Sequence, residues 1–156
     1  MIEIRKALKE DIESIVPLWI KLMDMHKAYD TWFKPATNGA EFYGAELQKW
    51  IDSPDHRVMV AISNKVVIAY VTGWVSPMPP VFEKKIRGYI NDVWVEDAYK
   101  SKGVGKDLVD AMRIFFKERN ADMISINAAL GNTRGVKFWQ EQGFGPVMYY
   151  MVQHLK

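Results

Sequence analysis

Hydrophobic and polar residues recur with two different periods in the first part of the chain. Residues 2–5 alternate apolar and charged side chains, which is typical of a short strand. From Ile12 to His26 the apolar residues follow a helical spacing, with Asp11 near the start of the expected helix. Pro17 lies inside that pattern and removes a helical N–H group, so we expect either a kink there or a helix that starts later.

The pattern then predicts a loop, a second helix and two strands. Residues 29–39 show no clear period and are expected to form the loop, whereas residues 40–51 have helical spacing. Strands are expected over residues 57–63 and 66–76, joined by a tight Asn-Lys turn. The proline-rich stretch that follows cannot pair in a sheet and marks a further loop.

The second half of the chain alternates strands with helices. A strand over residues 86–96 precedes an amphipathic helix whose apolar stripe extends from Val104 to Phe116. Residues 122–128 are expected to return as a strand. A strand–helix–strand unit of this kind indicates parallel neighbours with a right-handed connection.

Two further elements complete the expected fold. Asn132 caps a short helix that Gly143 ends, and residues 147–154 are expected to form a final strand. By the usual size of domains, residues 1–156 are expected to form one domain. The elements together predict a mixed α/β fold, with about four helices around a central sheet.

Composition narrows the chemistry and the surroundings of the protein. The chain has no cysteine, which excludes disulfides and thiolate zinc sites, and its three histidines are too scattered to suggest a metal site. The N-terminus does not resemble a signal peptide, and no apolar run is long enough to cross a bilayer. We therefore expect a cytoplasmic protein that binds no membrane. A formal charge of +2, with both signs interspersed, gives little attraction to nucleic acid.

The end of the fourth expected strand leads through a basic, glycine-containing turn into a helix. Gly103 and Gly105 have no Cβ, so the backbone can approach a ligand closely at this turn. The first N–H groups of a helix lack partners and carry partial positive charge, which suits a phosphate. A lone G-x-G pattern more often marks an ordinary loop with solvated lysines, but the flanking strand, the helix and three nearby lysines favour an anion site here.

Two segments in this region resemble the motifs of a known family. Residues 100–105 resemble the acetyl-CoA signature of the GCN5-related N-acetyltransferases, written Q/R-x-x-G-x-G/A, with Lys100 in the Q/R position. Residues 132–144 are similar to the family's N-x-x-A-x-x-F-Y-x-x-x-G-F segment, with Trp139 where tyrosine is usual. The two motifs occur in the family's order and spacing, and the resemblance is specific over about residues 88–144.

The resemblance implies where acetyl-CoA would lie as cosubstrate. The family fold is a mixed, mostly antiparallel sheet whose parallel fourth and fifth strands splay apart to admit the pantetheine arm. The backbone N–H of Val93 would contact the thioester carbonyl and Val95 would hold pantetheine, although both valines equally suit a plain strand core. The other cofactor residues that the resemblance implies are Lys100, Ser101, Lys102, Gly103, Val104, Gly105, Lys106, Asn132 and Trp139. Solvated lysines and a plain helix cap at Asn132 are the simpler alternatives.

The acid and the base of an acetyl transfer are less clearly marked. Trp139 can donate a hydrogen bond but cannot release a proton to a leaving thiolate, and Tyr149 or Tyr150 are the substitutes that the chain offers. A thiol with a pKa of about 8.5 leaves fairly readily, so turnover need not require an acid. Asp92 and Tyr89 on the fourth strand are the candidate bases, and water is the alternative route for the amine proton.

Acceptor contacts are expected from the first helix and the loop after it. His26, Tyr29 and Trp32 are candidates to bind a small-molecule or peptide amine, because ring faces suit apolar and cationic groups. Alternatively, His26 is a half-buried histidine with an ordinary partner, and the aromatic residues belong to the core or to a dimer contact.

The sequence thus predicts an acetyl-CoA-dependent N-acetyltransferase in which a primary amine attacks the thioester directly within a ternary complex. The chief alternative is a noncatalytic acyl-CoA sensor, because Trp139 replaces tyrosine and Asn91 is not a carboxylate. A more remote alternative is a nucleic-acid-binding protein that uses the lysines around the glycine turn. After Phe144 the chain has room for a single strand where the family usually has two, so we expect an incomplete sheet edge and a homodimer. The alternative to a dimer is a last strand that is buried on both faces within one subunit.

Overall fold

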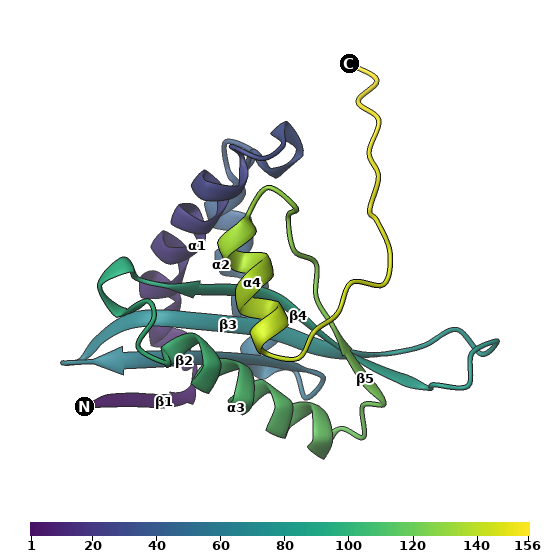
Figure 1. The fold of residues 1–156 in the computed structure, drawn as a ribbon. Helices are drawn as coiled ribbons and strands as arrows, with labels where there is room; N and C mark the ends of the chain where they lie inside the picture. The colour runs from purple at the N-terminus through teal and green to yellow at the C-terminus, as the bar shows by residue number, and fades with distance from the viewer.

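A five-stranded sheet, in the order β1-β2-β3-β4-β5, forms the centre of the computed structural model, which describes residues 1–156. The strands are β1 (Ile2–Lys6), β2 (His56–Ser63), β3 (Val66–Pro77), β4 (Ile86–Val95) and β5 (Met123–Ser125). The four α-helices are α1 (Ile12–His26), α2 (Gly39–Asp52), α3 (Val104–Glu118) and α4 (Thr133–Glu141). Strands β1 to β4 pair antiparallel and β4 pairs with β5 in parallel (Figure 1), which confirms the predicted fold class.

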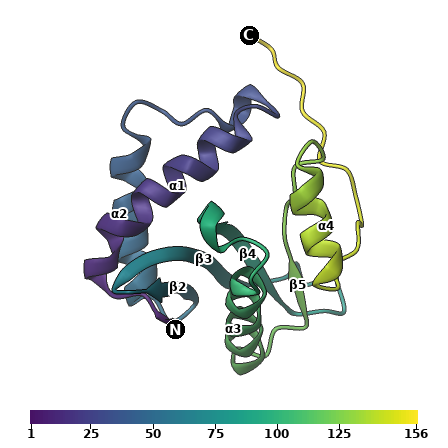
Figure 2. The same ribbon diagram turned by 60° about the vertical axis from the view of Figure 1, so that its left-hand side comes forward.

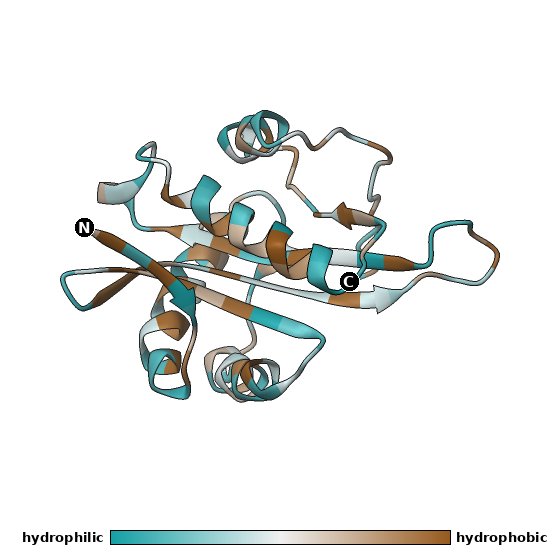
Figure 3. Ribbon diagram, turned by 90° about the horizontal axis from the view of Figure 1, so that it is seen from below, coloured by the Kyte–Doolittle hydropathy of each residue, from teal (hydrophilic) through white to brown (hydrophobic).

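Different helices cover the two faces of the sheet. Helices α1 and α2 pack on one face, where Leu18 and Leu47 belong to the same buried cluster as Tyr70 of β3. Helix α3 packs on the other face, with Phe116 in the same cluster as Ile90 of β4. Figure 2 shows α1 and α2 together on one side and α3 and α4 on the other, and Figure 3 shows hydrophobic stretches on the strands between them. None of the helices combines the length and the apolar character of a membrane span.

Helix α1 begins at Ile12 although Pro17 lies inside it, so the alternative of a later start is wrong. Pro17 is exposed, and the carbonyl group that loses its N–H partner can therefore be solvated. The start of the helix is tied to β1, because Asp11 accepts hydrogen bonds of 2.7 and 3.0 Å from Arg5 and one of 2.7 Å from the Leu8 N–H. These contacts fix where the helix begins.

The turn between β2 and β3 has the two-residue form that its sequence indicated. Asn64 and Lys65 have positive φ angles of 49° and 65°, as a type I′ turn requires, and Ser63 pairs with Val66 across it. An Asn-Lys turn is thus sufficient here, with the long β2–β3 ladder to stabilise it.

A bulge at Asn91 reverses the sheet faces to which successive side chains of β4 point. The register between β3 and β4 shifts at this point and leaves Asn91 as the extra residue. Ile90 lies in the core under α3, whereas Trp94 lies in the core under α1 and α2. Residues an even number apart would share one face in a regular strand. The bulge therefore turns Asp92 toward α2, and Val93 toward α3.

Strands β4 and β5 separate soon after they pair. Pairing is limited to residues Arg87–Tyr89 of β4 and Met123–Ser125 of β5. From Ile90 to Val95, the edge of β4 that faces away from β3 has no partner strand (Figure 1). The strand pair is thus open toward the end of β4 that leads into the glycine turn.

The backbone groups of Val93 and Val95 point to this open edge. The Glu96 N–H donates to the Ile68 carbonyl of β3 at 2.9 Å. Residues of an antiparallel strand alternate between groups that bond to the neighbour and groups that point away from it. Counting back from Glu96, the amides of Val93 and Val95 face away from β3, into the gap between β4 and β5.

The predicted final strand over residues 147–154 is wrong, because this segment has no regular structure. No residue beyond Phe144 makes a backbone–backbone hydrogen bond. Alternating apolar residues form a strand only beside a partner strand, and the segment extends away from the sheet (Figure 1). Strand β5 is also shorter than the expected residues 122–128, since the chain leaves β4 after Ser125.

Candidate active site

The turn between β4 and α3 holds Gly103 in a left-handed conformation, with a φ of +87° at the N-cap position of α3. A Cβ at Gly103 would contact nothing within 4 Å, so the space beside it is open. Gly105 has a different role, because a Cβ there would lie 3.3 Å from the ring of Phe138 in α4. The first glycine shapes the turn, and the second lets α3 lie close to α4.

The turn and the first turn of α3 present a run of free backbone donors. No backbone carbonyl accepts from the N–H groups of residues 101–106, and the Asp107 N–H is the first to donate, to the Gly103 carbonyl at 3.0 Å. No side chain caps the helix. Free N–H groups and the positive end of the helix dipole together favour an anion at this position.

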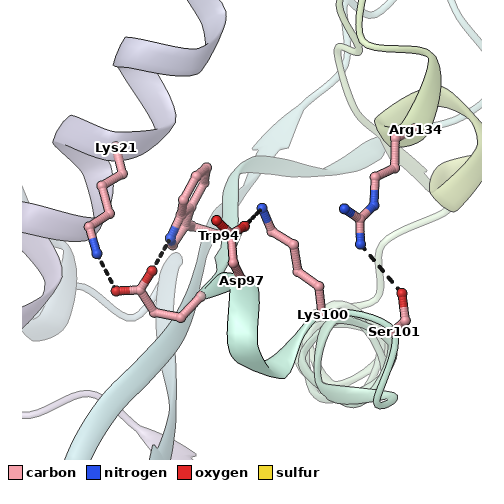
Figure 4. Close-up of polar contacts among 7 residues, drawn as sticks. Lys21, Trp94, Asp97, Lys100, Ser101 and Arg134 are labelled. Atoms are coloured by element: carbon pink, nitrogen blue, oxygen red, sulfur yellow. Dashed lines mark hydrogen bonds and ion pairs between the residues drawn. The ribbon is translucent and has the colours of Figure 1, made fainter.

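The lysines around the turn already have partners. Lys100 lies 2.5 Å from the Asp97 carboxylate, a contact that Figure 4 marks, and its ammonium group lies 4.5 Å from the centre of the Trp94 ring. Lys102 lies over the ring of Tyr99, and Lys106 forms an ion pair with an aspartate on the next helical turn. Backbone N–H groups are therefore the main free donors at this site.

Arg134 is a cationic residue that the sequence reasoning missed. It lies in the first turn of α4, and its guanidinium donates to the Ser101 hydroxyl at 3.4 Å (Figure 4). The signal for it was present, because Arg134 follows Asn132 within the second motif. Asn132 caps α4 by accepting from the Gly135 N–H at 2.9 Å. The starts of α3 and α4 thus meet at one turn, with an arginine between them.

Trp139 is a packing residue of α4. Its ring meets the rings of Phe138 and Phe144 edge-on, at centroid distances of 5.0 and 5.2 Å, and it packs against the core under α3. No protein group accepts a hydrogen bond from its indole N–H, and the one acidic residue of α4, Glu141, lies at the end of the helix and pairs with Lys137.

Asp92 is a buried carboxylate on the α2 side of the bulge, with 8% of its surface exposed. Its Oδ2 atom accepts from the Tyr43 hydroxyl at 2.7 Å, from Asn91 at 2.9 Å and from the Thr72 hydroxyl at 3.5 Å. Burial raises the pKa of the Asp92 carboxyl, and the hydrogen bond from Tyr43 opposes that rise. All three hydrogen bonds are to Oδ2, so the Oδ1 atom is free to accept a proton.

Tyr89 lies on the same strand but is a poorer base. Its hydroxyl accepts a 3.0 Å hydrogen bond from Asn127, and its ring lies 5.0 Å from that of Trp74. Burial, and then the charge of Asp92, raise the pKa of Tyr89 further above neutrality. A higher pKa brings a carboxyl group closer to the neutral range but takes a phenol further away.

The raised pKa of Asp92 gives a testable dependence of stability on pH. The folded protein holds the proton more tightly than the unfolded chain, so wild-type stability falls as the pH rises through the folded pKa. Asp92→Asn removes this titration but keeps an acceptor for Tyr43. Urea denaturation between about pH 4 and pH 8 should therefore show the wild type losing stability relative to Asp92→Asn as the pH rises. Parallel curves for the two proteins would contradict the burial effect.

The three candidate acceptor residues lie together at the end of α1. The Nδ1 atom of His26 lies 2.9 Å from the Leu22 carbonyl, and its ring contacts the Tyr29 ring at a centroid distance of 5.9 Å. Tyr29 also contacts the loop before α4, since a Cβ on Gly131 would lie 2.7 Å from its ring. Trp32 stacks on Tyr150 of the C-terminal segment at 5.1 Å. His26 therefore has an ordinary partner, while its Nε2 atom remains free.

Comparisons with known proteins agree with this arrangement. Residues 19–144 match the model of the acetyltransferase (GNAT) family. An uncharacterized N-acetyltransferase of Archaeoglobus fulgidus is 25% identical over 144 residues, which cover 90% of each chain. One of Methanocaldococcus jannaschii is 21% identical over 143 residues, and the match covers 90% of this chain but 59% of that protein.

Solved structures share the whole fold. A mutant protein of Bacillus halodurans superposes with a TM-score of 0.86 at 21% identity, covering 99% of each chain. A predicted acetyltransferase of Clostridium acetobutylicum, solved with acetyl-CoA, gives a TM-score of 0.83 at 20% identity, covering 99% of this chain and 97% of that one. Because the family model spans most of the sequence, including both motifs and the open strand pair, the chain belongs to the acetyltransferase (GNAT) family.

Proposed function

We propose that this chain transfers the acetyl group of acetyl-CoA to a primary amine, by direct attack of the amine within a ternary complex. The observation that carries the proposal is the run of free N–H groups over residues 101–106, placed directly after the open edge of β4. The free N–H groups suit the diphosphate of a nucleotide cofactor, and the open edge of β4 suits an extended pantetheine arm.

The cofactor would lie along the gap between β4 and β5. Its diphosphate would accept from the backbone of residues 101–106, with Arg134 near enough to add a charge-assisted hydrogen bond. Pantetheine amides would pair with the outward-facing backbone of Val95, much as a partner strand would. The N–H of Val93 would then donate to the thioester carbonyl and stabilise the negative charge that develops on it.

The acetyl transfer needs a route for the amine proton. The amine nitrogen forms a bond to the carbonyl carbon, the carbon–sulfur bond breaks, and the proton leaves through water to Oδ1 of Asp92. Asp92 is the better candidate than Tyr89, because its Oδ1 atom has no hydrogen-bond partner and because burial raises its pKa toward neutrality, whereas burial raises the pKa of Tyr89 away from it. With no cysteine in the chain, no acyl-cysteine intermediate can form.

Trp139→Phe is expected to keep kcat within about threefold of the wild type, a change of less than about 1 kcal/mol in the barrier. The coenzyme A thiolate is a fair leaving group, and the indole N–H makes no hydrogen bond that a phenylalanine would remove. Steady-state kcat at saturating acetyl-CoA measures this, and thermal unfolding checks the loss of ring packing. A fall of more than tenfold, with unchanged acetyl-CoA affinity, would show that the indole N–H takes part in the reaction.

A noncatalytic acyl-CoA sensor is the second candidate, and the packing role of Trp139 in the place of the usual tyrosine favours it. A thiol-release assay with acetyl-CoA and a panel of primary amines, from amino acids and polyamines to aminoglycosides and peptides, separates the two. Saturable acetyl-CoA binding with no thiol release for any amine would overturn the enzymatic proposal. The acceptor contacts at His26, Tyr29 and Trp32 and the cytoplasmic location remain predictions from the sequence.

A further inference from the structure

The part of the sheet nearest the β3–β4 hairpin carries aromatic and polar side chains on the face that bears α1 and α2. Figures 1 and 3 show β3 and β4 extending past these helices toward the hairpin. A Cβ on Gly88 would meet the ring of Phe116, so Gly88 faces α3. Because side chains alternate along a strand, Arg87 and Tyr89 point to the opposite face. Trp74 lies there too, with its ring 5.0 Å from that of Tyr89.

Arg87 is half-buried and has no carboxylate partner. Its guanidinium lies 5.7 Å from the centre of the Tyr89 ring, and its Nε atom is buried without a hydrogen bond. By contrast, Arg5, Arg113 and Arg119 each pair with an aspartate. Cations that are removed from water are normally paired with an anion. The donors of Arg87 are therefore available to an anion from outside the chain.

Two serine hydroxyls lie on the same face beside this guanidinium. Ser76 is opposite Arg87 across β3 and β4, and Ser125 is opposite Tyr89 across β4 and β5. Ile124 packs in the core under α3, so Ser125 faces the other way. Both hydroxyls are buried and have no hydrogen-bond partner. Buried polar groups are rarely left unpaired, and donors that gather beside one cation suit a negatively charged ligand.

A carboxylate fits this set of donors better than a phosphate. A guanidinium is planar, and its paired N–H groups match the two oxygens of a carboxylate, while each hydroxyl adds a single donor. The one positive charge of Arg87 balances one carboxylate, whereas a phosphate monoester carries nearly two negative charges. Trp74 also contacts Trp50 and His56. Such aromatic surroundings keep water away and strengthen an ion pair.

This site and Asp92 lie along the same strand, with Tyr89 between them. Burial, and then the negative charge of Asp92, raise the pKa of Tyr89, and the positive charge of Arg87 opposes that rise, so Tyr89 is close to both. Each strand residue adds about 3.3 Å, so the Arg87 guanidinium, beside the Tyr89 ring, lies roughly 7–10 Å from Asp92. One acceptor molecule can therefore reach both groups.

We propose that Arg87, with Ser76 and Ser125, binds a carboxylate on the acceptor while the reacting amine lies near Asp92. The acceptor is then an amino carboxylate whose two ends are as far apart as those of a di- or tripeptide, since an extended peptide spans about 3.3–3.6 Å per residue. An α-amino acid, with one carbon between its α-amine and carboxylate, is too short to reach from its α-amine. This substrate class rests on the proposed acetyl transfer, whereas binding of the carboxylate does not.

Paired acceptors that differ only in the carboxylate test the role of Arg87. In the thiol-release assay, the wild type should show a kcat/KM about 30-fold higher for triglycine than for triglycine amide. Arg87→Gln should reduce this preference to less than about twofold, and Arg87→Lys, which keeps the charge but not the fork, should retain part of it. Arg119→Gln is the matched control, since it removes the same charge from an arginine that pairs with Asp55, and it should keep the preference. No preference in the wild type, or a full preference in folded Arg87→Gln or Arg87→Lys, would overturn the site.

Binding without turnover separates this site from the acetyl transfer. Isothermal titration of the protein saturated with coenzyme A, which carries no acetyl group, should show triglycine binding at least about tenfold more tightly than its amide. The difference should vanish in Arg87→Gln. If no amine released thiol, the proposed function would fail while this difference in affinity still supported the carboxylate site. Equal affinities of the two peptides for the wild type would overturn the carboxylate site alone.

Acceptor length tests the distance between the two ends. Across glycine, diglycine, triglycine and pentaglycine, kcat/KM should be highest for diglycine or triglycine and at least about tenfold lower for glycine, which cannot reach both groups. In Arg87→Gln this maximum should flatten. Glycine as the best acceptor of the wild type would contradict the proposed spacing.

Discussion

Gly103→Asp is expected to weaken acetyl-CoA binding about 100-fold, equivalent to about 2.8 kcal/mol. The free N–H groups of residues 101–106 surround this position, and the space beside Gly103 is open, so an aspartate would fit without a steric clash. Its carboxylate would lie beside the cofactor diphosphate, and like charges brought together at a binding site cost several kcal/mol. Isothermal titration calorimetry with acetyl-CoA measures the loss.

Gly103→Asn is the matched control for this substitution. Asparagine and aspartate have nearly the same shape, and both tolerate the left-handed conformation of Gly103 better than other residues. The two variants should therefore share any cost to the turn and differ in charge alone. Equal acetyl-CoA affinities in two folded variants would remove the diphosphate from this turn. Gly105 is unsuitable for this test, because a side chain there would press on Phe138.

Asp92→Asn is expected to lower kcat/KM for the amine about 100-fold while leaving acetyl-CoA affinity unchanged, as loss of a general base commonly does. Asparagine keeps the shape of the side chain and an acceptor for the Tyr43 hydroxyl, but it cannot take up a proton. Because the Asp92 side chain points to α2, whereas the cofactor would bind backbone groups at the free edge of β4 and in the turn after it, the cofactor site should not change. Steady-state kinetics and a direct acetyl-CoA titration separate the two effects.

The pH profile adds a second readout for Asp92. In the wild type, kcat/KM should fall as the pH drops through the raised pKa of the Asp92 carboxyl, because the base becomes protonated. This acid limb should be missing from Asp92→Asn. Tyr89→Phe is the comparison, and it should keep most of the activity if Tyr89 only packs and accepts from Asn127. An unchanged acid limb in Asp92→Asn would assign the proton to water or to another group.

Local patterns were sufficient to predict most of the elements. The helical stripe before His26, the alternation on both sides of the Asn-Lys turn, and the cap at Asn132 each depend on residues close together in the sequence. The glycine turn could also be predicted, because its strand, turn and helix follow one another directly in the sequence. Where a local apolar pattern and an adjacent turn are enough to define a helix or a strand, the sequence contains the information needed to predict it.

Other features depend on neighbours that are distant in the sequence. The bulge at Asn91 depends on how β4 registers with β3, and the burial of Asp92 depends on Tyr43 from α2. The meeting of Arg134 with Ser101 depends on how α4 packs beside the turn before α3. The prediction of a final strand over residues 147–154 was wrong for the same reason. Apolar alternation shows that a segment can pair in a sheet, but it does not supply the partner strand.

In the proposed reaction, the single extra residue at Asn91 places the acetyl donor and the acceptor amine against different parts of β4. The cofactor would meet main-chain atoms at the free edge of β4, whose positions hardly depend on which side chains the strand carries. The acceptor amine would meet Asp92 on the sheet face covered by α1 and α2, and these helices share no core residues with the α3 layer. Evolution or an engineer can therefore rebuild the acceptor wall for a new amine while the acetyl donor keeps its place, so that donor and acceptor preference change separately.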